Sequence, residues 1–212
     1  MKIALIGASG FVGSAILNEA VSRGHSVTAI VRDTSKLTPH PQVRAVAVDA
    51  QDPQALADVL KGHDRVISAY NPGWSAPDIH DQYLKGASAI VEAANAAHSW
   101  LLVVGGAGSL EIAPGVQLVD TPDFPAEWKQ GALAARDGLT ALRRETTLDW
   151  RFVSPPVFLE PGEKRGGYRL GGDQVLFDGD KPAGITVGDL ADGVLNEAET
   201  PAHLRQRFTL GY

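Results

Sequence analysis

The residues that could do chemistry begin with three glycines near the N-terminus, Gly7, Gly10 and Gly13. They follow a short apolar run, Lys2–Ile6, and open a stretch with helical spacing, Val12–Ser22. In such a turn the first glycine permits a tight bend, the second admits a phosphate to the backbone, and the third lets the helix pack on its strand. The helix start then offers free N–H groups and a partial positive charge to an anion. The other contacts predicted in this turn are Ser9, Phe11 and Val12.

The context of the three glycines decides between two interpretations. Their spacing, Gly-x-x-Gly-x-x-Gly, also fits an ordinary strand–helix turn that binds nothing. Here the turn follows the first predicted strand, opens a helix and precedes a second apolar run, Ser26–Val31. This order of strand, glycine turn, helix and strand is the one that binds nicotinamide dinucleotides. We therefore predict that the chain binds such a dinucleotide through its pyrophosphate.

The end of the second predicted strand indicates which dinucleotide binds. An acidic residue there binds the ribose 2′-hydroxyl of NAD, whereas an arginine accepts the 2′-phosphate of NADP. The strand ends in Arg32, whose guanidinium matches a phosphate with two parallel hydrogen bonds. Asp33 follows and either binds the ribose or starts a turn with Thr34 and Ser35. Arg32 favours NADP, and Asp33 keeps NAD open as the alternative.

Two further loops follow predicted strands and enter the same crevice. Asp49 comes after the third strand, where its carboxylate either meets the adenine amino group or caps a turn. After the fourth strand, small Ala69 would let the backbone approach the cofactor. The rings of Tyr70 and Trp74 could stack on a planar substrate or could anchor the loop in the core. The other cofactor contacts predicted in these loops are Ala50, Tyr70 and Asn71.

A third loop, after the fifth predicted strand, holds three glycines in four residues at Gly105, Gly106 and Gly108. We predict that Gly105, Gly106 and Ala107 lie close to the nicotinamide and that Ser109 offers a hydroxyl at the reaction centre. A nucleophilic serine is excluded because Gly-Ser-Leu does not form a nucleophile elbow. The six histidines have no metal-ligand spacing, so no metal site is predicted.

The elements that must position these loops alternate between strands and helices. Short apolar runs rich in Val and Ile predict buried strands, and the stretches between them have helical spacing. The predicted strands are Lys2–Ile6, Ser26–Val31, Val43–Val48, Arg65–Ser68, Leu101–Val104, Arg151–Val153 and Arg207–Leu210, and the predicted helices are Val12–Ser22, Pro53–Leu60, Asp81–Ala97, Ala126–Arg144 and Val187–Glu199. This alternation implies right-handed crossovers, and hence a Rossmann-type α/β fold with a doubly wound parallel sheet.

A change of texture after the sixth predicted strand indicates a small lobe on the substrate side. Two consecutive prolines and a Gly-rich stretch over residues 162–184 break the helical rhythm. Within it, Tyr168–Leu170 and Gln174–Phe177 resemble the two strands of a hairpin around a Gly-Gly turn. No shift in composition marks a flexible linker. We therefore expect one domain over residues 1–212, whose residues 155–185 form the small C-terminal lobe.

The composition restricts the partners. The formal net charge is −6 and the pI is about 5.5, so a broad basic surface for nucleic acid is not expected. There is no cysteine for disulfides or thiolate metal sites, and no apolar run approaches the ~20 residues that a membrane span requires. We expect a cytoplasmic protein whose partner is a small planar acceptor. The helix faces give no signal for an oligomeric state.

Beyond these separate motifs, the sequence resembles a known family over nearly its whole length. The blocks that carry the likeness are Lys2–Gly13, Val31–Asp33, Val103–Leu110, Ser154–Pro156 and Tyr168–Asp173. They are similar to those of atypical short-chain dehydrogenase/reductases with an NAD(P)H-binding, NmrA-like core, and in particular to bacterial proteins described as NADH-flavin reductases. The resemblance implies that Pro155 and Pro156 lie against the nicotinamide.

Two catalytic features of such proteins are missing. The Tyr-x-x-x-Lys pair of ordinary members should fall in the helix that starts near Glu127, where this chain has Trp128-Lys129-Gln130-Gly131-Ala132. The histidine that biliverdin reductase-like proteins place just after the paired prolines is here Val157. Reduction of a carbonyl needs a positioned acid, whereas hydride transfer to a flavin or quinone-like ring can draw its proton from water. The second kind of chemistry is therefore favoured.

We accordingly predict an NAD(P)H-dependent reductase that passes a hydride to a flavin or quinone-like acceptor. The acceptor ring would pack beside Tyr70, Trp74 or Phe158, and Ser109 would bond its reacting end. Two alternatives stay open. An NmrA-like redox sensor would bind the dinucleotide without catalysis. A sugar-nucleotide epimerase or dehydratase would rely on the missing tyrosine and lysine and would carry a larger substrate lobe.

Overall fold

The chain folds around one eight-stranded sheet, and the computed structural model describes all of residues 1–212. Its strands are β1 (Lys2–Ile6), β2 (Ser26–Val31), β3 (Val43–Ala47), β4 (Arg65–Ser68), β5 (Trp100–Val104), β8 (Asp149–Ser154), β10 (Arg169–Gly171) and β14 (Gln206–Gly211). Their order across the sheet is β3-β2-β1-β4-β5-β8-β14-β10. Neighbouring strands run parallel, except that β10 is antiparallel to β14.

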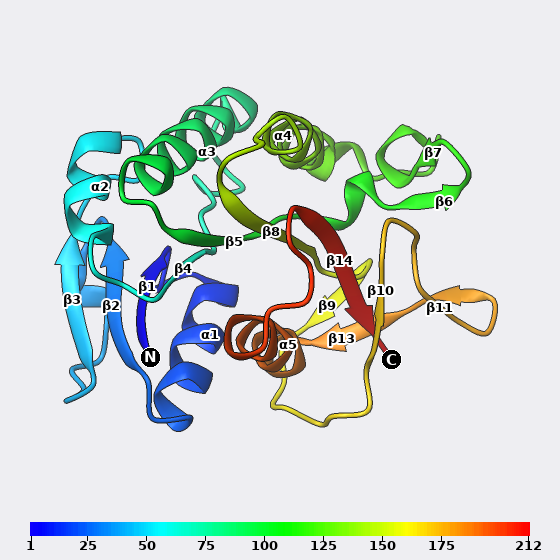
Figure 1. Cartoon of the computed structure of the whole chain (residues 1–212). Coiled ribbons are helices and arrows are strands. Elements are labelled where there is room, and N and C mark those ends of the chain that lie inside the picture. The colour runs from blue at the N-terminus through cyan, green and yellow to red at the C-terminus, as the bar shows by residue number, and fades with distance from the viewer.

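Helices cover both faces of this sheet (Figure 1). They are α1 (Phe11–Ser22), α2 (Pro53–Leu60), α3 (Ile79–Ala96), α4 (Ala126–Leu142) and α5 (Val187–Glu199). A cluster of 22 buried residues lies under α1 and α5, and a second cluster of 17 lies under the other three. The structure is therefore the predicted doubly wound Rossmann-type fold. None of the helices combines the length and the apolar character needed to cross a membrane.

Element boundaries agree best with the prediction where a local signal marks them. The strands β1, β2 and β4 and the helices α2 and α5 begin and end at the predicted residues. Helix α2 starts at Pro53, and its N-cap Asp52 accepts the backbone N–H of Ala55 at 3.0 Å. Helix α5 starts after Thr186, whose Oγ1 accepts the backbone N–H of Asp189 at 3.1 Å. The N-cap side chains thus mark the first residues of these helices where the sequence predicts them.

The predicted hairpin of residues 168–170 and 174–177 is wrong. Strand β10 instead pairs with β14, where Leu170 lies opposite Leu210. Residues Phe177–Asp178 (β11) pair with Lys181–Pro182 (β12). Between them, Asp173 is held by Arg207 on β14, with Nε 2.7 Å from Oδ1, which takes the chain away from a local turn. The free edge of β14 offers ladder hydrogen bonds that compete with the short-range pairing.

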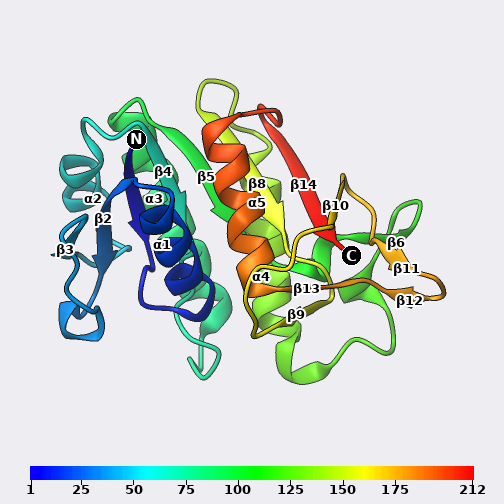
Figure 2. The ribbon, with the colours of Figure 1, turned by 90° about the horizontal axis from the view of Figure 1, so that it is seen from below.

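Two further strand pairs are too short to show in the sequence pattern. Strand β9 (Phe158–Glu160) runs parallel to β13 (Gly184–Thr186), and β6 (Glu111–Ala113) runs antiparallel to β7 (Val116–Gln117). Figure 2 shows that β6, β9, β11, β12 and β13 all lie toward the β10 side of the sheet, away from β3. The segments that follow β5 and β8 therefore add structure on one side only.

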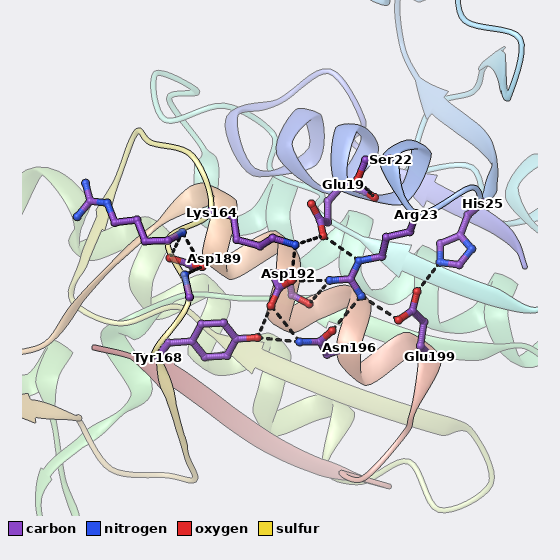
Figure 3. A network of polar contacts seen from close by, with 12 residues as sticks. Glu19, Ser22, Arg23, His25, Lys164, Tyr168, Asp189, Asp192, Asn196 and Glu199 are labelled. Carbon is purple, nitrogen blue, oxygen red and sulfur yellow. Dashed lines mark hydrogen bonds and ion pairs between the residues drawn. The ribbon is translucent and has the colours of Figure 1, made fainter.

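A seam of polar contacts joins α1 to α5 on the lower face of Figure 1, and Figure 3 shows it closely. Arg23, at the C-terminal end of α1, donates to Glu19 at 2.8 Å, to Asp192 at 2.6 Å and to Glu199 at 2.9 Å. The Arg23 side chain is only 16% exposed. Because water is largely excluded, these charges interact more strongly than an ion pair on the open surface.

The same seam fixes the segment between β9 and β10. Lys164 Nζ lies 2.9 Å from Glu19 and 3.0 Å from Asp192, and Tyr168 Oη donates to Asp192 at 2.6 Å. Burial, together with the hydrogen bond to the Asp192 carboxylate, raises the pKa of the Tyr168 phenol, which therefore stays protonated and keeps this contact. The side of the molecule that follows β8 is thus attached to the helix that begins beside the first glycine turn (Figure 3).

Replacing Arg23 with methionine tests the contribution of the seam. We expect the free energy of unfolding to fall by about 1–3 kcal/mol, because Glu19 and Asp192 keep their charges, lose the Arg23 guanidinium and retain only Lys164 as a cationic partner. Urea denaturation measures the change. Lys61→Met is the matched control, since Lys61 and Asp58 are 61% and 59% exposed, and its cost should stay below about 0.5 kcal/mol. Equal losses in the two variants would show that the seam adds no stability.

Candidate dinucleotide site

The turn between β1 and α1 is held by backbone contacts that admit only glycine at two positions. Gly7 has a φ of +79°, and a Cβ there would lie 2.6 Å from the carbonyl oxygen of Ala69. A Cβ on Gly13 would lie 2.1 Å from the carbonyl oxygen of Gly7. The N–H of Gly7 also donates to Ile30 at 2.9 Å. The turn is therefore closed against the ends of β2 and β4.

Gly10 differs, because nothing in the chain itself requires a glycine there. Its φ of −78° and ψ of 172° suit any residue, and a Cβ would approach only the Gly7 carbonyl oxygen, at 3.4 Å. As the N-cap of α1 it supplies no side-chain acceptor, and Ser9, Gly10 and Phe11 are exposed. The first-turn N–H groups of α1 are open to an anion, and the missing side chain leaves room for one. A pyrophosphate fits this helix start.

The end of β2 presents Arg32 and Asp33 in different states. Arg32 is exposed and makes no ion pair and no side-chain hydrogen bond. Asp33 Oδ1 accepts the backbone N–H of Ser35 at 3.0 Å and its hydroxyl at 2.7 Å, as the N-cap of a short turn. These two hydrogen bonds lower the pKa of Asp33. The guanidinium of Arg32 is thus free to bind a phosphate. Asp33 instead caps the turn that it forms with Thr34 and Ser35.

The side chains of Asp49 and Asn71, which were predicted to contact the cofactor, accept hydrogen bonds from within the chain. Asp49 Oδ1 accepts the backbone N–H of Gln51 at 3.0 Å, and Asn71 Oδ1 accepts that of Gly73 at 2.8 Å. Turn capping is therefore the role that the structure gives to both side chains. Ala50 is buried, while Ala69 is half-buried beside the first glycine turn, so only Ala69 leaves the edge of the sheet open to a cofactor.

Tyr70 anchors its loop to α3. Its ring fills the space left by Gly86, where a Cβ would lie 2.3 Å from Cε1, and its hydroxyl donates to the carbonyl oxygen of Gln82 at 3.0 Å. Burial raises the pKa of the Tyr70 phenol. The expectation that Tyr70 stacks on an acceptor has no support, because its ring is committed to packing.

Packing also explains two of the three glycines after β5. A Cβ on Gly105 would lie 1.9 Å from the ring of Phe152, and one on Gly108 would lie 2.8 Å from the Cβ of Ala132. Neither position could carry a side chain without displacing these neighbours. Packing within the chain therefore explains both glycines without a nicotinamide nearby.

The rest of this loop divides into an open part and a buried part. Gly106 has no neighbour closer than 3.6 Å to an added Cβ, and both it and Ala107 are half-exposed. Ser109 is only 3% exposed, and its hydroxyl accepts a hydrogen bond from Arg207 at 3.0 Å, while Arg207 is in turn paired with Asp173. Gly106 and Ala107 are open to a nicotinamide, and the contact of Ser109 with an acceptor stays a prediction.

Ser154, at the end of β8, is a functional candidate that the sequence did not single out. It is completely buried, and its hydroxyl has no hydrogen-bond partner. An unbonded buried hydroxyl costs about 1–3 kcal/mol, so it points to a missing ligand group. A nicotinamide carboxamide, which carries both a donor and an acceptor, fits this need. Pro155 and Pro156 follow directly and are buried, and their contact with a nicotinamide stays a prediction.

Helix α4 covers the place where the tyrosine and lysine of ordinary family members were expected. It has Trp128 and Ala132 four residues apart, and Ala132 is packed against Gly108. Tyr83 on α3 is 6% exposed, and burial raises its pKa to about 12. Tyr83 therefore cannot serve as the acid in the crevice.

The remaining aromatic residues predicted at the acceptor are exposed. Trp74, in the loop between β4 and α3, is 63% exposed, and Phe158, at the start of β9, is 53% exposed. Both follow parallel strands at the edge of the sheet where the first glycine turn lies. Their rings are free to meet a ligand.

Comparisons with known proteins agree with this geometry. Residues 7–201 match the model of a family described as NAD(P)H-binding. A structure from Bacteroides thetaiotaomicron, provisionally described as an epimerase, is 41% identical, with a TM-score of 0.93 and coverage of 100% of this chain and 96% of that one. A Streptococcus pneumoniae protein, provisionally described as an NADH-flavin reductase, is 38% identical, with a TM-score of 0.89 and coverage of 100% and 99%.

A third solved structure bears on the compartment. It comes from Burkholderia pseudomallei, is provisionally described as an exported protein, and is 40% identical, with a TM-score of 0.90 and full coverage of both chains. This description differs from the cytoplasmic location that the composition predicts. The location of the present chain therefore stays a prediction. The three structures agree on the fold and differ in the roles that their descriptions give.

Alanine substitutions at Gly10 and Gly13 separate folding from binding. Gly10→Ala should change the free energy of unfolding by less than about 0.5 kcal/mol. It should weaken dinucleotide binding at least about tenfold, because the methyl group takes the space of the pyrophosphate. Gly13→Ala should destabilise the fold by about 2 kcal/mol or more, since its Cβ would overlap the Gly7 carbonyl. Calorimetric titration and urea denaturation measure these effects, and unchanged affinity in Gly10→Ala would contradict the pyrophosphate assignment.

Proposed function

Because the chain belongs to the NAD(P)H-binding family, we propose that it is a reductase that transfers a hydride from NADPH to an oxidised flavin or quinone-like ring. The observation that carries this proposal is helix α4, which contains no tyrosine and so lacks the Tyr-x-x-x-Lys pair expected there. A carbonyl oxygen gaining negative charge would have no positioned proton donor there. A flavin or quinone-like ring delocalises that charge and can take its proton from water.

The residues of the crevice would act by binding and orientation. The N–H groups at the start of α1 hold the pyrophosphate, Arg32 holds the 2′-phosphate, and the Ser154 hydroxyl bonds the carboxamide. NADPH, when bound, supplies the hydride. The open backbone at Gly106 and Ala107 leaves room for two rings to meet at the sheet edge. Holding the two reactants in contact is itself a large rate effect, so no protein acid is needed.

Two other functions compete with this proposal. The description of the Bacteroides relative favours an epimerase, but epimerases rely on the same tyrosine and lysine, so this function is the less well supported. A redox sensor that binds the dinucleotide and signals to a partner would also need no tyrosine–lysine pair. Both the reductase and the sensor would bind the dinucleotide in the same site, but only the reductase would oxidise NADPH catalytically.

Cofactor preference is tested at Arg32. Arg32→Ala should weaken NADPH binding about 10- to 100-fold, the value of a charge-assisted contact to a phosphate, and NADH binding less than about threefold. Arg44→Ala is the control, because Arg44 is also an exposed, unpaired arginine but lies within β3. Fluorescence titration with both dinucleotides measures the affinities. Equal losses for NADPH and NADH would remove the phosphate-binding role of Arg32.

Turnover is tested by following the absorbance of NADPH in the presence of riboflavin, FMN or a soluble quinone. We expect at least one acceptor to be reduced well above the rate of the free reaction, with a rate that depends little on pH between about 6 and 8, since no protein acid takes part. The Gly10→Ala variant serves as the control for binding-dependent turnover. Tight NADPH binding without accelerated oxidation by any of these acceptors would favour the sensor and reject the reductase.

A further inference from the structure

Two of the four tryptophans are exposed on one side of the candidate site. Trp74 is 63% exposed and Trp128 is 53% exposed, whereas Trp100 and Trp150 are buried at 7% and 1%. Leaving two large aromatic side chains in water forgoes burial worth about 25 cal/mol for each Å². Neither the fold nor the dinucleotide contacts described above use the exposed faces of these rings.

Both exposed tryptophans lie at the first two turns of α4: Trp128 belongs to the helix, and the Trp74 ring lies against it. A Cβ on Gly131 would lie 2.6 Å from Trp74 Cζ3 and 3.2 Å from Ile79 Cδ1, so the Trp74 ring rests on the helix at Gly131. Gly131 is three residues after Trp128, and residues three apart are neighbours on a helix surface. Loop and helix thus bring both rings to one face.

This face of α4 continues into the nicotinamide end of the crevice. One turn after Trp128, Ala132 packs on Gly108, and a Cβ on Gly106 would lie 3.6 Å from the Cβ of Ala135. The axial rise from Trp128 to Ala135 is about 10 Å, at ~1.5 Å for each of seven residues. That is close to the length of a fused three-ring system. A ring lying on the tryptophans would extend toward the open backbone at Gly106.

The charges on the same segments favour an acceptor without a phosphate. The charged neighbours of the two tryptophans in the chain are Asp78, Asp81, Asp123, Glu127 and Lys129, all of them exposed. His80 is close by, but both of its ring nitrogens face carboxylates, those of Asp81 and Asp137. Arg136, on the same helix, is likewise paired with carboxylates, those of Asp120 and Asp137, so acidic groups outnumber basic ones around the face. A phosphate dianion would be repelled from it at low ionic strength.

We propose that Trp74 and Trp128 form the platform on which the acceptor stacks, and that this acceptor is an uncharged planar conjugated ring. The inference rests on the proposed function, because it names where the hydride acceptor lies. Trp128 lies in the helix where the Tyr-x-x-x-Lys pair was expected, and its ring offers a stacking surface there. The platform binds the ring, and the proton still comes from water.

The experiment measures riboflavin binding by equilibrium dialysis with saturating NADP⁺, which prevents turnover. Trp74→Ala and Trp128→Ala should each weaken riboflavin binding about tenfold, the value of one lost stacking contact, and leave NADP⁺ binding unchanged. The Phe variants keep a stacking surface and should stay within about threefold of the unmodified protein. Leu204→Ala is the control, since Leu204 is 52% exposed and precedes β14, at the ends of the parallel strands opposite the crevice.

Each outcome separates the platform from the proposed function. Unchanged riboflavin affinity in both alanine variants would overturn the platform, as would an equal loss in Leu204→Ala. FMN should bind more weakly than riboflavin at low salt, with a difference that shrinks as salt is added, and tighter binding of FMN would overturn the uncharged acceptor. If NADPH is never oxidised but riboflavin binding still depends on both tryptophans, the platform stands and the reductase fails. If turnover occurs and the alanine variants keep the acceptor KM, the reverse holds.

Discussion

Three backbone segments meet at van der Waals distance around Gly7: the end of β1, the end of β4 at Ala69, and the start of α1 at Gly13. A side chain at Gly7 or Gly13 would push these segments apart. Because they touch, the open N-terminus of α1 lies directly over the point between β1 and β4 where the strand order reverses. Arg32 at the end of β2 and Gly106 after β5 take their places on either side of this contact.

Much of this arrangement could be predicted from the sequence, because its signals are local. Continuous apolar runs such as Lys2–Ile6 mark strands that are buried on both faces, and Asp52-Pro53 marks a helix start. The hairpin failed because its strands chose partners distant in the chain: β10 pairs with β14, about 40 residues later. Short-range turn chemistry cannot reveal that a distant strand edge is still unpaired.

The site was predictable to the same degree and for the same reason. Gly7, Gly10 and Gly13 lie within seven residues, so their spacing can be recognised in the sequence. Gly105 resembled a ligand contact, but its reason is the ring of Phe152, which no local pattern indicates. The isolation of the Ser154 hydroxyl and the meeting of Trp74 with Gly131 likewise exist only in three dimensions. Contacts between distant segments are what the sequence leaves open.

The antiparallel strand β10 has a consequence for the behaviour of the molecule in concentrated solution. Without it, β14 would expose a buried-type edge, with Phe208 and Leu210 in its middle, to any passing strand. With it, the sheet ends in three residues that include the charged Arg169, whose guanidinium bonds the carbonyl of Phe177. Such a short, charged border is a poor template for growth by a second molecule, so the fold limits its own aggregation there.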